Sequence, residues 1–127
     1  MPQQAAACPY PAAAAGAFAG LSGPYDVSGV PEIALALFGT TEHNDPRLWA
    51  DGNPLTHAAS RPGVPALLLH GKADVDVPVS FTTQFAAALK DGGHQVTVDL
   101  VAGADHSGIY QSDVAAPRLI DWIHHLR

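Results

Sequence analysis

The sequence is poor in cysteine and in basic residues, and both shortages exclude classes of protein. Cys8 is the only cysteine among 127 residues, so neither an internal disulfide nor a cage of cysteine thiolates around a metal can form. Six lysines and arginines stand against twelve aspartates and glutamates, which gives a formal net charge of −6. Because no basic patch can neutralise phosphates, we expect no nucleic-acid partner and no binding to an acidic membrane surface.

Long apolar runs are missing as well. No stretch approaches the roughly 20 apolar residues that a membrane-spanning helix requires. Residues 1–16 contain neither lysine nor arginine, so the charged start of a secretion signal is absent. We interpret residues 1–16 as a flexible lead-in. Because a single cysteine fits a reducing compartment, we expect a cytoplasmic location.

The rest of the chain, residues 17–127, predicts one α/β domain with enough apolar material, 47% of the sequence, to form a core. The patterns predict strands at 17–21, 65–70 and 95–101, helices at 31–38, 80–90 and 112–126, and short helical turns at 46–50 and 54–58. Strand–helix–strand connections of this length favour about three parallel strands with right-handed crossovers. We expect the two long helices to cover one sheet face only in part. Ser112 is expected to cap the last helix, whose apolar face would include Leu119, Trp122 and Ile123.

The segment at about 25–61 is irregular and rich in glycine, proline, aspartate and asparagine, as in a lid or a binding region. Its aromatic residues Tyr25, Phe38 and Trp49 either line a pocket for an acyl group or belong to the core. The strand at 17–21 is expected to present an open edge to a partner strand.

Two loops are predicted to leave the carboxyl edge of this sheet, where open α/β sheets build their sites. The first reads HGKADVDVP at residues 70–78, and the second reads GADHSGIY at residues 103–110. A histidine that acts as a general base needs a carboxylate to orient its ring. Asp74 and His106 are separated by one helix and one strand, so the crossover can bring the two loops together.

These two loops resemble the acid and histidine loops of α/β-hydrolases, and more narrowly those of carboxylesterase and hormone-sensitive-lipase-like enzymes, including esterases related to feruloyl esterases. Residues 20–26, GLSGPYD, resemble the sixth strand of that family and the loop after it, and residues 53–58, NPLTHA, resemble the segment before the seventh strand. The resemblance covers about residues 16–127. It implies a partial α/β-hydrolase fold, the C-terminal half only, with a lid-like insertion.

The resemblance also implies the roles of single residues: Asp74 is the acid of a catalytic triad and His106 its general base. Asp76 competes for the acid role because it lies in the same loop. We expect His70 to pack in the core and to bond to the backbone, since the triad order of this fold is serine, aspartate, histidine. Asp105 is expected to bond to local backbone. Neither a metal nor another cofactor is implied.

The nucleophile of the family lies in a Gly-x-Ser-x-Gly turn, and this sequence contains no such pentapeptide. Ser22 is nearest in appearance, but no helix is predicted directly after it. We therefore expect a half of a serine carboxylic-ester hydrolase, inactive or nearly so by itself, whose substrate would be a small ester. It would be completed by a separate N-terminal half, or would self-associate through the open edge. Two alternatives stay open: a non-catalytic remnant or binding module, and the same half of a prolyl-oligopeptidase-like peptidase.

Overall fold

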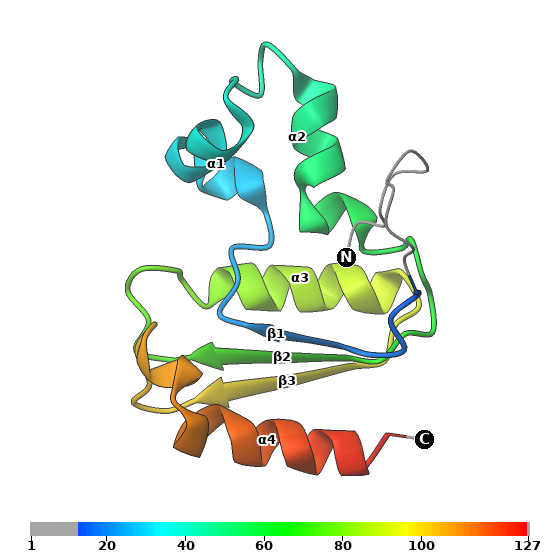
Figure 1. Ribbon diagram of the computed structural model, residues 1–127, viewed down its shortest axis with the longest axis vertical. Coiled ribbons are helices and arrows are strands. Elements are labelled where there is room, and N and C mark those ends of the chain that lie inside the picture. The colour runs from blue at the N-terminus through cyan, green and yellow to red at the C-terminus, as the bar shows by residue number, and fades with distance from the viewer. Residues whose placement is uncertain (1–12, 127) are drawn as a thin grey trace.

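The computed structural model describes residues 13–126, so Cys8 and most of the expected lead-in lie outside the described residues. Three parallel strands, in the spatial order β1-β2-β3, form the sheet (Figure 1). The strands are β1 (Phe18–Leu21), β2 (Ala66–Gly71) and β3 (Val96–Val101). The helices are η1 (Val27–Gly29), α1 (Pro31–Phe38), α2 (Pro46–Gly52), η2 (Pro54–His57), α3 (Ser80–Asp91), η3 (Gly108–Tyr110) and α4 (Ser112–His124). The prediction of about three parallel strands with flanking helices is therefore confirmed.

The central strand β2 explains why residues 65–70 are continuously apolar. Every residue of β2 is buried, because β1 and β3 flank it and helices cover both of its faces. The register pairs Leu68 with Gly20 on one side and with Val98 on the other. The carboxyl ends of all three strands therefore lie at one edge of the sheet.

The two long helices cover opposite faces of the sheet, contrary to the expectation that both would partly cover one face (Figure 1). Side chains of successive strand residues point to opposite faces. Ala66 and Leu68 accordingly share a core cluster with Phe85 of α3, whereas Leu67 and Leu69 share the other cluster, to which Trp122 of α4 contributes. Each face of β2 thus has its own helix.

Most predicted boundaries agree with the observed ones to within two residues, and α1 begins at Pro31 and ends at Phe38 as expected. The cap of α4 was predicted wrongly. Gln111 precedes the helix and Ser112 is its first residue, with no side-chain hydrogen bond at the cap. Leu119 and Trp122 pack on the core, but Ile123 of the predicted apolar face is 55% exposed.

The helices α1 and α2 rise from the layer of α3 on the side away from α4 (Figure 1). Of the aromatic residues of this region, Tyr25 and Trp49 are buried and Phe38 is partly buried, which favours a role in packing. Trp49 is buried against Phe38, with ring centroids 5.5 Å apart, and its indole N–H donates to the carbonyl of Thr40. Tyr25 is also buried and stacks on Phe85 of α3 at 4.4 Å. A lid role for residues 25–61 stays a prediction.

Candidate active site

The two loops predicted at the carboxyl edge of the sheet lie against each other. Gly71 ends β2, and a side chain at this position would collide with the backbone carbonyl of Ala104 in the second loop. Only glycine permits so close an approach. The backbone N–H of Ala73 donates to the carbonyl of Ala104 at 2.9 Å, and that of Lys72 donates to Val101 at 2.9 Å. These bonds hold the first loop on the second.

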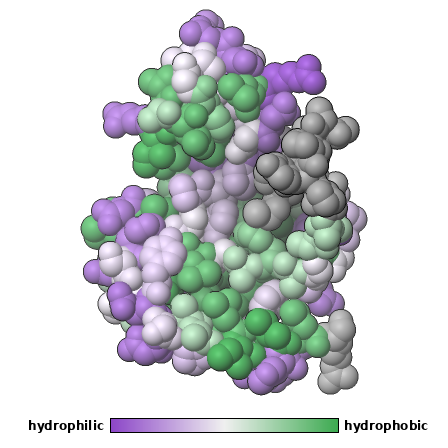
Figure 2. Space-filling view, viewed as in Figure 1, coloured by the Kyte–Doolittle hydropathy of each residue, from purple (hydrophilic) through white to green (hydrophobic). Residues whose placement is uncertain are grey.

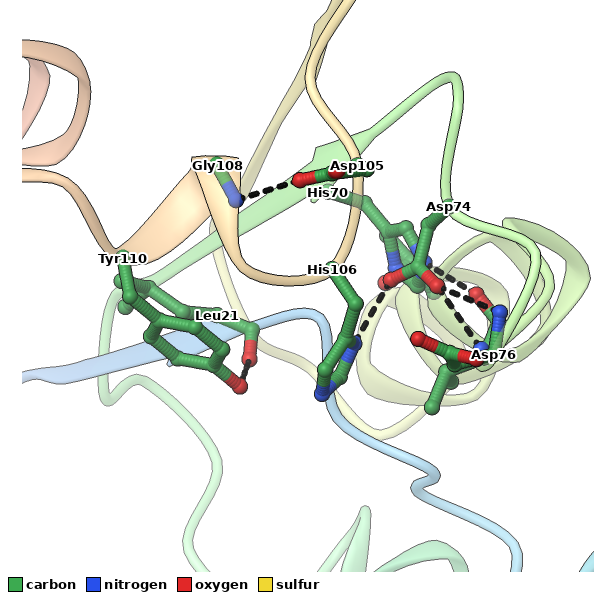
Figure 3. A network of polar contacts seen from close by, with 10 residues as sticks. Leu21, His70, Asp74, Asp76, Asp105, His106, Gly108 and Tyr110 are labelled. Atoms are coloured by element: carbon green, nitrogen blue, oxygen red, sulfur yellow. Dashed lines mark hydrogen bonds and ion pairs between the residues drawn. The ribbon is translucent and has the colours of Figure 1, made fainter.

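Asp74 and His106 meet across this junction (Figure 3). His106 Nδ1 lies 2.8 Å from Asp74 Oδ2. The carboxylate side chain is completely buried, whereas the imidazole side chain is 31% exposed. A carboxylate can only accept, so Nδ1 carries the proton and the neutral imidazole is left with an unprotonated Nε2. The arrangement combines an inaccessible acid with an imidazole that solvent or a substrate can reach.

The other carboxylate oxygen of Asp74 accepts two backbone N–H groups. Val77 donates to Oδ1 at 2.8 Å and Asp76 donates at 3.0 Å. Burial by itself raises the pKa of the Asp74 carboxyl, but the bonds from Val77, His106 and Asp76 outweigh it and hold the pKa below its ordinary value. Asp74 is therefore a carboxylate at neutral pH, which is the form that orients a histidine.

Tyr110 supports His106 on the side away from Asp74, a contact that the sequence did not reveal. Its ring meets the imidazole edge-on, with centroids 5.5 Å apart and an angle of 79°. Its hydroxyl donates to the carbonyl of Leu21, 89 residues earlier, at 3.0 Å (Figure 3). Tyr110 thus connects the histidine loop to the carboxyl end of β1. In the sequence, only the position of Tyr110 in the same loop, four residues after His106, pointed to this contact.

The structure also places the other candidate residues. Asp76 is exposed and contributes its backbone N–H to Asp74, and in the described structure its own carboxylate forms neither a hydrogen bond nor an ion pair with His106. Asp105 accepts the backbone N–H of Gly108, as expected. His70 is completely buried and bonds to a backbone carbonyl, also as expected.

Ser22 is not presented as a nucleophile. The residue is completely buried and its hydroxyl has no hydrogen-bond partner in the described structure. Its φ of +50° is left-handed, the only positive φ of a non-glycine residue among residues 13–126. The chain then enters a loop and the short helix η1, so the sharp strand-to-helix turn of a nucleophile elbow is absent here.

Among residues 13–126, no group of three or more histidine, cysteine, aspartate or glutamate side chains is arranged to hold a metal ion. No helix in the same range is long and apolar enough to cross a membrane. The candidate site is formed by the hydrogen-bonded side chains of Asp74 and His106, with Tyr110 beside them.

Residues 32–125 match the prolyl oligopeptidase family, which is most of the chain and includes both loops of the site. The chain belongs to the prolyl oligopeptidase family. The resemblance to α/β-hydrolases is thereby confirmed. The matching family is the prolyl-oligopeptidase-like one, which was expected only as an alternative to the carboxylesterases. No curated protein matches the chain.

Solved structures of this fold superimpose on the chain. Dipeptidyl peptidase 4 of Porphyromonas gingivalis is 17% identical with a TM-score of 0.66, over 84% of this chain and 15% of its own. Puromycin hydrolase is 25% identical with a TM-score of 0.64, over 81% and 17%. The butyrate-bound thermophilic esterase of Thermogutta terrifontis is 25% identical with a TM-score of 0.52, over 76% and 34%. The chain thus spans between about one sixth and one third of these three similar proteins.

Proposed function

We propose that this chain supplies the acid and the base of a serine-hydrolase catalytic triad, with Asp74 orienting His106. The observation that carries the proposal is the 2.8 Å contact between His106 Nδ1 and Asp74 Oδ2, with the carboxylate buried and the imidazole partly exposed. Among the described residues, this pair alone joins a buried carboxylate to a reachable imidazole by a short hydrogen bond.

The proton chemistry follows from the tautomer. His106 Nε2 takes the proton of a serine hydroxyl as the oxygen attacks an acyl carbon, and later gives it to the leaving group. The imidazolium formed in between is stabilised by Asp74, which stays ionised throughout. The lowered pKa of Asp74 serves this role, because a protonated acid would neither fix the tautomer nor stabilise the cation.

The serine must come from outside these 127 residues, since no Gly-x-Ser-x-Gly occurs in them. Within residues 13–126, no strand pairs with the outer edge of β1, and Tyr110 places His106 beside the carboxyl end of that strand. A separate N-terminal half that pairs with this edge would bring its serine toward Nε2. By itself the chain lacks both nucleophile and oxyanion donors, and we expect it to be inactive.

The family match favours an amide or peptide bond as the bond that is cleaved. A carboxylic ester is the second candidate, because the Thermogutta terrifontis esterase is as similar in sequence as puromycin hydrolase. The chemistry at His106 is the same for both, since each reaction transfers an acyl group to serine. The residues that line the acyl pocket of the completed protein would decide between the two substrates.

The coding DNA before residue 1 gives the first test. An in-frame Gly-x-Ser-x-Gly after a strand pattern identifies the nucleophile half, which is then produced joined to these 127 residues or mixed with them. The assays compare p-nitrophenyl butyrate with peptidyl p-nitroanilides. We expect Asp74→Asn to lower kcat by about 10⁴-fold through the wrong tautomer, and His106→Ala to abolish turnover.

Asp76→Asn is the matched control, because its carboxylate is exposed and lies in the same loop. It should leave kcat within about twofold. Full activity of Asp74→Asn would refute the proposal. A completed protein that neither turns over these substrates nor reacts with a fluorophosphonate probe would instead support the non-catalytic alternative.

A further inference from the structure

His70 lies directly behind the acid of the site. It is the fifth residue of β2 and is completely buried. Because strand side chains alternate, His70 shares the face of Ala66 and Leu68, which α3 covers. A buried polar ring in an apolar strand is costly unless both of its nitrogens are bonded.

Both ring nitrogens of His70 have partners. Nε2 lies 2.7 Å from the backbone carbonyl of Val77, and Nδ1 lies 2.6 Å from the hydroxyl of Thr82 in α3. A carbonyl can only accept, so Nε2 carries the proton. In the neutral ring, Nδ1 then accepts from Thr82, whose side chain is also completely buried. The carbonyl of Val77 thereby fixes the tautomer of His70, and the hydroxyl of Thr82 bonds to the ring nitrogen that is left as an acceptor.

The bond to Val77 connects His70 to the carboxylate of Asp74. Val77 uses its carbonyl to accept from His70 and its N–H to donate to Asp74 Oδ1 at 2.8 Å. Nε2 of His70 also lies 3.5 Å from Asp74 Oδ2, the oxygen that accepts from His106 (Figure 3). The acid is therefore held between two histidines, one buried and one partly exposed.

We infer that His70 is a positioning residue, which holds the loop from Gly71 to Val77 so that Asp74 Oδ2 faces His106. Thr82 anchors the ring to α3, and the ring anchors the loop through the carbonyl of Val77. The inference rests on the proposed function for its catalytic meaning, but the geometry it describes can be measured without turnover.

Two amide substitutions separate the two bonds of His70. In His70→Gln the amide N–H reaches the place of Nε2 and keeps the bond to Val77. In His70→Asn the shorter amide reaches only the place of Nδ1, so it keeps a polar contact with Thr82 and loses Val77. The positioning role predicts that the glutamine variant preserves the site and that the asparagine variant does not.

The readout is the Nδ1 proton of His106 in proton NMR spectra of the chain, which a bond to a carboxylate shifts downfield and protects from solvent exchange. We expect His70→Asn to speed its exchange about tenfold, the effect of losing one buried hydrogen bond, or to remove the signal. His70→Gln should restore it. His94→Gln is the control, because it removes the bond between Nδ1 of His94 and the carbonyl of Val64, away from the site, and should leave the exchange of the His106 proton unchanged.

A purely structural role of His70 gives a different result. Both variants would then lower the free energy of unfolding by similar amounts and leave the His106 proton in place, which would overturn the inference. If a His70 variant does not fold, Thr82→Val against Thr82→Ser makes the same comparison, with the valine variant expected to show the faster exchange. Asp74→Asn must remove the proton signal. If it does not, the proposed site fails, and this failure is separate from that of His70.

Discussion

The central strand β2 differs sharply from helix α1 in how its apolar residues are used. Leu68 and Leu69 of β2 have no exposed surface, whereas Ile33 and Leu37 of α1 are 67% and 75% exposed. Only Ala34 of α1 is buried. Figure 2 shows a cluster of hydrophobic residues on the surface over α1.

This difference shows which apolar surfaces the described residues cover. A helix that is apolar on all sides is usually buried, so α1 exposes surface that its own neighbours do not cover. The residues of the candidate site lie at the carboxyl edge of the sheet, where backbone bonds join the loops and Gly71 lets them touch. The acid and the histidine are therefore placed by packing that is already present.

The buried strand and the exposed helix can be compared by equal truncations. Leu69→Ala should lower the free energy of unfolding by about 2–5 kcal/mol, because it leaves a cavity in the core beside Val101 and Ile109. Leu37→Ala should change it by less than about 0.5 kcal/mol. Urea unfolding followed by circular dichroism measures both. Equal effects would mean that α1 is covered in solution, and the contrast between the two regions would be wrong.

Asp74→Asn should cost about 1–3 kcal/mol of stability, because the amide puts a donor where Oδ2 accepts from His106. Asp76→Asn, two residues along the same loop, should stay within about 0.5 kcal/mol. The same urea unfolding compares them. Similar losses in the two variants would mean that the buried carboxylate does not hold the loops together.

The stability that Asp74 contributes should depend on pH with a definite sign. Its pKa is lower in the folded chain than the ordinary 3.8, so the unfolded chain binds the proton more tightly. The contribution is complete above about pH 5 and is lost as the pH falls below about 4 and passes through the lowered folded pKa. The difference in unfolding free energy between the wild type and Asp74→Asn should shrink over that range. A difference that grows on acidification would contradict the lowered pKa.

Tyr110→Phe should have a small effect, about 0.5–1.5 kcal/mol, from the loss of the bond between the hydroxyl and the carbonyl of Leu21. The phenylalanine ring still packs on His106, so the Nδ1 proton of His106 should keep its chemical shift. Thermal unfolding and proton NMR together test this. Loss of the proton signal would show that the bond to β1, and not the ring, supports the histidine.

Local sequence patterns were sufficient to predict most of the strands and helices. The continuous apolar run before His70 marks a strand buried on both faces, and Pro31 marks the start of α1 because its ring suits the first turn of a helix. The choice of Asp74 over Asp76 came from the resemblance to α/β-hydrolases, since both carboxylates lie in the same loop. The structure then brings Asp74 into contact with His106 and leaves Asp76 exposed.

The amino-acid sequence by itself determined the strands, the helices and the two loops, because propensity and apolar periodicity act over a few neighbouring residues. Only the tertiary structure decided that α3 and α4 take opposite faces, that Thr82 bonds to the ring of His70, and that Tyr110 reaches Leu21. Each of these depends on contacts between segments that are well separated in sequence. Such contacts form only when the sheet fixes the distances between its loops and helices.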